Sequence, residues 1–139
     1  MKALYAWAFA GLLTLGGAVH PVQAGDGDPL FLNLTTDDVH RSSMAVGFGV
    51  KQQARGHALT LFLNDKGVLL ASQAHAGRFA EQQKGIAEVL AQGGSVIVCP
   101  MCMKYYGMQE AELMPGVKLG GPDLIGAALF KDNTRTLTW

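Results

Sequence analysis

The stretch Ser95-Val96-Ile97-Val98-Cys99-Pro100-Met101-Cys102 carries the strongest structural signal in the chain. Its first four residues favour a buried β-strand, because β-branched apolar side chains pack well on a pleated surface. Gly93-Gly94 precedes it and ends a helical pattern. The strand leads directly into a Cys-x-x-Cys pair, so we expect Cys99 and Cys102 to lie at the carboxyl end of a strand.

Strand and helix patterns alternate outward from this segment in both directions. The expected elements are a strand at 30–34, a helix from the cap at 35–38 to about 55, a strand at 57–63, a turn at 64–67, a short strand or loop wall at 68–71, a helix at 78–92, a helix at 122–130 and a strand at 134–139. The connections are too long for hairpins and favour parallel pairing. The sequence therefore predicts one α/β domain, a mainly parallel sheet with helices on both faces.

Length and composition agree with one packed domain. Of the 139 residues, 49% are apolar and 16% charged, which is typical of a globular chain. Eleven Lys and Arg residues balance eleven Asp and Glu residues, and the basic ones are scattered. No positive field exists to attract nucleic acid, so we expect no nucleic-acid partner.

Residues 1–24 have the pattern of a signal peptide. Lys2 gives a positive start, an apolar run covers 3–19, and Val22-Gln23-Ala24 is a small-x-small cleavage pattern. The alternative is a retained membrane anchor, but the run is short for a full span and ends at His20-Pro21. We predict a signal peptide at 1–24 and a domain at 25–139 that is periplasmic or secreted, with no membrane contact after cleavage.

The cysteine pair is the candidate working site. Ligands of open α/β sheets bind at the carboxyl ends of strands, where a following helix directs its free amides toward them. A thiolate at Cys99 would gain stability there and react as a nucleophile, with Cys102 as a second thiol. The alternative is that Cys99 simply ends the strand as a buried apolar residue. A disulfide between the two would close a very small loop and stabilise little.

Two metal alternatives and one redox alternative remain open for this pair. Thioether and thiolate ligands suit Cu(I), so Cys99 and Cys102 with Met103 or Met101 form a possible copper set. Structural zinc wants four Cys or His ligands, whereas the chain has one Cys pair and dispersed histidines. A dithiol oxidoreductase also places Cys-x-x-Cys at a strand-to-helix junction, but it needs a cis-proline facing the pair and the chain offers no obvious one.

The pattern Cys99-Pro-Met-Cys102-Met103-Lys-Tyr-Tyr-Gly107, preceded by the strand at 96–98, resembles the DsrE/DsrF-like family of the DsrEFH superfamily. These are small sulfur-handling proteins that include sulfur-relay subunits. The resemblance covers nearly all of 25–139. The family's reactive cysteine stands eight residues before a glycine, as Cys99 does before Gly107, and one branch adds a cysteine at the position of Cys102. Tyr106 stands where the family often has arginine.

The resemblance implies a sulfur-relay function without a cofactor. In that chemistry the Cys99 thiolate attacks a sulfur donor and holds the extra sulfur as a persulfide, and Cys102 can resolve it as a disulfide. The implied partners are sulfur donor and acceptor proteins or inorganic sulfur species, and the implied assembly is a trimer or hexamer. Many members are cytoplasmic, whereas the leader pattern predicts an exported protein. We therefore expect an exported sulfur carrier or sulfurtransferase.

Overall fold

The computed structural model describes residues 25–139, and the predicted signal peptide at 1–24 lies outside the described residues. The strands are β1 (Leu30–Leu34), β2 (Leu59–Leu63), β3 (Ser95–Val98), β4 (Lys118–Leu119) and β5 (Arg135–Thr138). The α-helices are α1 (Val39–Gln53), α2 (Ala76–Ala91), α3 (Pro100–Tyr105) and α4 (Pro122–Leu129), and the 3-10 helices are η1 (Asp65–Ala71), η2 (Gln73–His75) and η3 (Glu110–Glu112).

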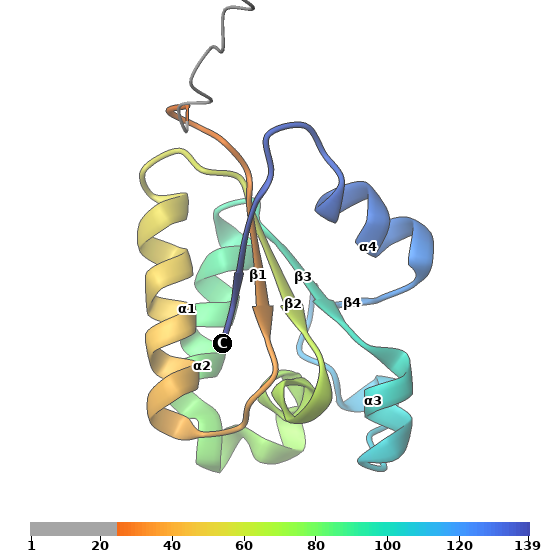
Figure 1. The fold of residues 1–139 in the computed structure, drawn as a ribbon. Helices are drawn as coiled ribbons and strands as arrows, with labels where there is room; N and C mark the ends of the chain where they lie inside the picture. Colours follow the sequence, from red (N-terminus) through yellow and green to blue (C-terminus); the bar gives the residue numbers. More distant parts are fainter. Residues whose placement is uncertain (1–24) are drawn as a thin grey trace, which may run out of the picture.

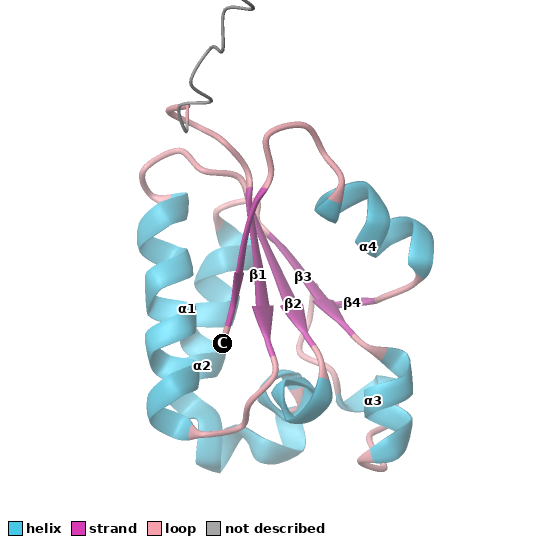
Figure 2. Cartoon of the chain, viewed as in Figure 1, coloured by secondary structure: helices cyan, strands magenta, loops and turns pink. Residues whose placement is uncertain are grey.

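The five strands form one sheet in the order β4-β3-β2-β1-β5, and every pair is parallel. Figure 1 shows α1 and α2 together on one face and α4 on the other, and Figure 2 shows the same layers by element type. The crossover through α4 carries the chain from one edge of the sheet to the opposite edge, where β5 pairs with β1. The predicted single α/β domain is confirmed, with a sheet that is wholly parallel.

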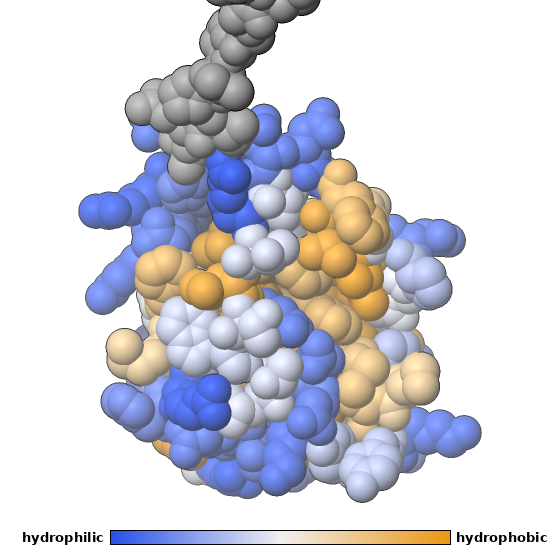
Figure 3. Space-filling model, viewed as in Figure 1, coloured by the Kyte–Doolittle hydropathy of each residue, from blue (hydrophilic) through white to orange (hydrophobic). Residues whose placement is uncertain are grey.

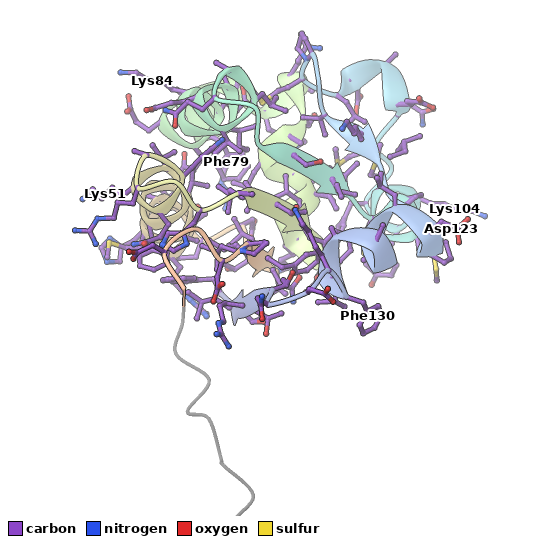
Figure 4. All side chains as sticks on the ribbon, turned by 90° about the horizontal axis from the view of Figure 1, so that it is seen from above. Lys51, Phe79, Lys84, Lys104, Asp123 and Phe130 are labelled. Carbon is purple, nitrogen blue, oxygen red and sulfur yellow. The ribbon has the colours of Figure 1, made fainter. Side chains whose placement is uncertain are left out.

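The core lies between the sheet and the α1–α2 layer. Alternate residues of β1, β2 and β3 point toward these helices, as the two-residue period of a strand requires. The buried strand residues on this side are Leu32, Leu34, Leu59, Leu61, Leu63, Val96 and Val98. Phe79 of α2 is 0% exposed, and Figure 4 shows it pointing inward between its helix and the sheet. The helices contribute the other half of the core through Val46, Phe79, Ile86 and Val89.

The opposite face of the sheet is less well covered. α4 buries none of its residues, and Phe62 of the central strand β2 is only half-buried. Leu124 and Phe130 are exposed at 37% and 82%. Figure 3 shows apolar side chains gathered over α4 and along the side of the molecule below it, while more hydrophilic residues cover much of the remaining visible surface. An apolar surface of this kind is typical of an interaction site.

The ends of α1 follow from its local sequence. Asp38 caps the first turn by accepting a hydrogen bond from the Arg41 backbone N–H at 2.8 Å. After the helix ends at Gln53, Gly56 adopts a φ of 97°, which favours glycine. The predicted cap and stop are therefore both found, although the helix proper is shorter than the predicted span.

Two segments differ from the sequence-based expectation. Residues 68–71, expected as a strand or loop wall, belong to the 3-10 helix η1, whose apolar side chains are buried against α2 and α3. Gly67 lets this helix approach β1 closely, since a Cβ there would lie 2.2 Å from the Leu34 carbonyl oxygen. The strand β4 was not predicted, because two residues show no periodicity. Within residues 25–139, no helix has the length and apolarity needed to cross a membrane.

Candidate functional site

Cys99 sits where the strand β3 becomes the helix α3. Its backbone N–H donates to the Leu63 carbonyl oxygen at 3.0 Å, which extends the β3–β2 ladder by one residue. Its side chain caps α3, and Pro100 occupies the first turn, where a missing N–H costs nothing. Cys99 therefore lies at the carboxyl end of the sheet, as predicted.

The structure brings the two cysteines together. The Cys102 backbone N–H donates to the Cys99 sulfur at 3.3 Å. Both thiols are free and partly exposed. A backbone N–H of the helix α3 thus lies directly beside the Cys99 sulfur.

Burial raises the pKa of the Cys102 thiol above its ordinary value, and its hydrogen bond to Cys99 raises it further. A backbone hydrogen bond with Asp65 acts in the opposite direction but is outweighed. Cys102 therefore keeps its proton at neutral pH. In this state its side chain can act as a hydrogen-bond donor.

Tyr106 and Asp65 form a second pair beside Cys102. The Tyr106 hydroxyl donates a short hydrogen bond to the Asp65 carboxylate, although the two residues are 41 positions apart. Asp65 opens η1 with a φ of 45°, a left-handed conformation that is uncommon for a residue other than glycine. No local sequence pattern indicates this contact, because Asp65 lies in an ordinary turn sequence before Gly67.

The hydrogen bond to Asp65 raises the pKa of Tyr106 from 10.0 to about 12. The folded state thus favours the protonated phenol, so the contribution of this pair to stability is present below the ordinary tyrosine pKa and is lost as the pH rises through about 12. We expect Asp65→Asn to return the pKa of Tyr106 toward its ordinary value. Ultraviolet absorbance of tyrosinate at pH about 11 measures this difference.

In that titration Tyr106→Phe is the control, since it removes the signal of this one phenol from the chain. The wild-type spectrum at the chosen pH should resemble that of Tyr106→Phe, and Asp65→Asn should show one additional tyrosinate. Equal tyrosinate absorbance in the wild type and Asp65→Asn would show that the pair does not form.

The two thiols open onto different cavities. Cys99 lines a cavity of about 400 Å³ between the start of α3 and the helix α4. Cys102 lines a cavity of about 450 Å³ whose other walls include Asp65, Tyr105 and Tyr106. Met101, which is 82% exposed, lies at the edge of both. The site therefore offers a donor or acceptor two separate approaches to the cysteine pair.

The methionines of the copper hypothesis occupy unlike places. Met103 is 4% exposed and packs in the main core, whereas Met101 is the thioether that borders both cysteine cavities. Among residues 25–139, no group of three His, Cys, Asp or Glu side chains is placed to hold a metal ion. The Cys99, Cys102 and Met103 ligand set stays a prediction from sequence.

This fold and site define a class, a small parallel α/β protein with a thiol pair at the carboxyl end of its sheet. A sequence model of the DsrE/DsrF-like family matches residues 32–138. The chain belongs to the DsrE/DsrF-like family.

Solved structures share the fold at low sequence identity. The ychN protein of E. coli is 16% identical, with a TM-score of 0.69, and the match covers 81% of this chain and 99% of that one. A protein of unknown function from Methanobacterium thermoautotrophicum is 14% identical, with a TM-score of 0.60 and coverage of 80% and 98%. A conserved protein of unknown function from Bacteroides thetaiotaomicron is 18% identical, with a TM-score of 0.63 and coverage of 81% and 95%. A comparison with curated proteins gives no significant match.

Proposed function

We propose that this protein carries or transfers sulfane sulfur as a persulfide on Cys99, with Cys102 as the second thiol. The observation that carries the proposal is the hydrogen bond from the Cys102 N–H to the Cys99 sulfur, in a residue that also lines a cavity at the carboxyl end of the sheet. Membership of the DsrE/DsrF-like family supports a sulfur-relay type of function. The protein acts as a carrier or sulfurtransferase, and its chemistry needs no cofactor.

Loading is a thiolate exchange reaction. The Cys99 thiolate attacks the outer sulfur of a donor persulfide, a new S–S bond forms at Cys99, and the donor leaves as a thiolate when its own S–S bond breaks. An acceptor thiolate can then attack the outer sulfur and carry it away, which regenerates Cys99. Alternatively, Cys102 attacks the inner sulfur, forms a disulfide with Cys99 and releases sulfide. In each step one S–S bond replaces another, so no external oxidant is required.

The hydrogen bonds assign different roles to the two cysteines. Because the pKa of Cys102 is raised, Cys102 remains a thiol, while the Cys99 sulfur accepts the Cys102 backbone N–H. Sulfur therefore loads on Cys99 first. Cys102 takes part only when it loses its proton, for example to a departing group.

The proposal also places the protein outside the cytoplasm. Residues 1–24 carry the positive start, apolar run and cleavage pattern of a signal peptide. The domain at 25–139 is thus periplasmic or secreted, where it meets sulfur donor and acceptor proteins or inorganic sulfur species. Amino-terminal sequencing of the exported protein should begin at Gly25, and an intact leader on the exported protein would contradict this assignment.

We further propose that the protein assembles into a trimer or hexamer. The apolar surface over α4, with Leu124 and Phe130 exposed, is the support on this chain for self-association. Light scattering after size-exclusion chromatography should give the mass of three or six chains. Leu124→Glu should shift the mass toward a single chain, because it puts a charge on that surface. A single-chain mass for the wild type at all concentrations would overturn the proposal.

The central experiment measures sulfur loading directly. Reduced protein is exposed to inorganic polysulfide, free thiols are trapped by rapid alkylation, and peptide masses are recorded. The expected result is the mass of added sulfur on the Cys99 peptide. If Cys99 gains no sulfur from polysulfide or from an uncharged sulfane-sulfur donor, the carrier proposal fails, and an equilibrium dialysis with Cu(I) then tests the copper alternative.

A further inference from the structure

The cavity beside Cys99 has an apolar wall. It lies between the end of β3 and α4, and its side chains include Ile125, Leu129 and Phe130. Of the described side chains that line it, none is charged, and the Cys99 thiol is the most polar. Its volume of about 400 Å³ lies within the usual range of small-molecule sites. The cavity thus joins a nucleophilic sulfur to a hydrophobic surface.

The side chain of Ile125 brings this wall close to the reacting atom. A Cβ built at Gly120 would meet the Ile125 Cδ1 at 3.0 Å and the Val98 carbonyl oxygen at 2.8 Å. The absence of a side chain at Gly120 therefore lets the tip of Ile125 reach the end of β3, next to Cys99. Ile125 and Cys99 line the same cavity, so Ile125 is the position at which to change the character of its wall.

Anionic donors find no favourable charge on either side of the pair. An anion that enters the Cys99 cavity loses water without gaining a cationic side chain, which is costly. The Cys102 cavity carries the Asp65 carboxylate, which repels anions. Lys104 lines a different cavity, on the other side of Pro100. The charges of the site therefore select against donors such as thiosulfate.

We infer that Cys99 takes its sulfur from an uncharged, apolar sulfane-sulfur compound held in this cavity, with ring elemental sulfur as the representative. The inference deepens the proposed function and rests on it. The apolar walls give such a compound a favourable transfer from water, roughly in proportion to the area that they cover. The same walls hold it against the sulfur of Cys99.

The reaction with ring sulfur balances without another reagent. The Cys99 thiol first loses its proton to solvent, and the thiolate attacks one ring sulfur. A new S–S bond forms at Cys99 while one ring S–S bond breaks, and the electron pair of the broken bond goes to the far sulfur, which becomes the chain-end anion. The product is a Cys99 polysulfide, from which thiol acceptors can remove sulfur atoms in turn.

Two substitutions on α4 form a matched pair for the test. Ile125→Glu puts a carboxylate in the cavity wall, while Ala127→Glu adds the same charge to the same helix at an exposed position outside the cavity. We expect Ile125→Glu to slow loading from ring sulfur about tenfold relative to Ala127→Glu, because the added charge makes the wall unfavourable for an apolar ligand. Phe130→Glu, at a residue 82% exposed, repeats the test at the cavity mouth without disturbing the core.

The experiment compares ring sulfur, thiosulfate and inorganic polysulfide as donors, each normalised to its reaction with free cysteine. Sulfur added to the Cys99 peptide is measured by mass, and circular dichroism verifies the fold of each variant. The inference is supported if the normalised rate of the wild type is about tenfold higher with ring sulfur than with thiosulfate. This preference should be lost in Ile125→Glu and in Phe130→Glu. Loading from polysulfide without this preference, or equal rates in Ile125→Glu and Ala127→Glu, overturns it and leaves the carrier function standing. Loading from none of the three donors overturns both.

Discussion

Cys99→Ser is expected to reduce sulfur loading to background while the fold remains intact. A serine hydroxyl is not ionised at neutral pH and cannot attack a sulfane sulfur as a thiolate does. Serine is also a strongly preferred helix cap, so its oxygen can accept the Cys102 N–H in place of the sulfur. Peptide mass spectrometry after exposure to polysulfide measures the loading, and thermal unfolding verifies that the stability is retained.

Cys102→Ser is the matched control for this variant. It keeps Cys99 as the nucleophile but removes the thiol that can form a disulfide, so the Cys99 persulfide should load and persist longer than in the wild type. If the Cys99→Ser protein still gained sulfur on Cys102 at the wild-type rate, the nucleophile would be Cys102 and the assignment to Cys99 would be wrong. Loss of loading in both variants would instead require the two thiols to act as a unit.

Phe79→Ala is expected to lower the free energy of unfolding by about 3–5 kcal/mol. Phe79 is 0% exposed and fills the space between α2 and the sheet, so its removal leaves a cavity that the parallel strands cannot easily close. Its backbone departs from helical geometry, with φ −118° and ψ 29°, at a kink near the start of α2. Urea denaturation at one low protein concentration measures the change.

Phe130→Ala provides the comparison, since the same side chain is 82% exposed at the end of α4. Figure 4 shows Phe130 at the outer edge of the molecule, in contrast to Phe79. Under conditions where the chain is a monomer, an exposed substitution of this kind changes the free energy of unfolding by less than about 0.5 kcal/mol. Equal losses in the two variants would contradict the placement of the core on the α1–α2 side.

Much of the fold could be predicted because its elements are long enough to show their periods. The strand at 30–34 coincides with β1, and the segment at 95–98 coincides with β3. The errors fall where tertiary contacts decide. Residues 68–71 have the apolar composition of a strand, yet they form part of a 3-10 helix. Their side chains are buried by contacts with α2 and α3, and this burial does not depend on strand pairing. The placement of β5 beside β1 also depends on the whole sheet and not on local sequence.

The position of the two cysteines at the end of β3 could be predicted from sequence, whereas the residues around them could not. Cys99 and Cys102 are close in sequence, so a strand followed by a helix suffices to bring them together. The pairing of Tyr106 with Asp65 depends on how η1 packs against α3, which no local pattern encodes. The apolar cavity similarly needs α4 to cross the sheet and return above Cys99. The juxtaposition of the two cysteines thus depends on local sequence, whereas the shape and polarity of the cavities beside them depend on the tertiary fold.

The position of β5 also affects the order in which the chain can fold. β1, β2 and β3 are neighbours connected through α1 and α2, so they can associate as soon as residue 98 has been synthesised. The other edge of β1 stays unpaired until β5 is in place. Its partner there is distant in sequence, since Leu30 pairs with Arg135. Closing such a long loop is entropically costly, and contacts of this kind slow folding. The sheet is therefore complete only when β5 pairs with β1, and α4 is held in place by the same late step. The cavity between Cys99 and α4 thus forms at the final stage of folding.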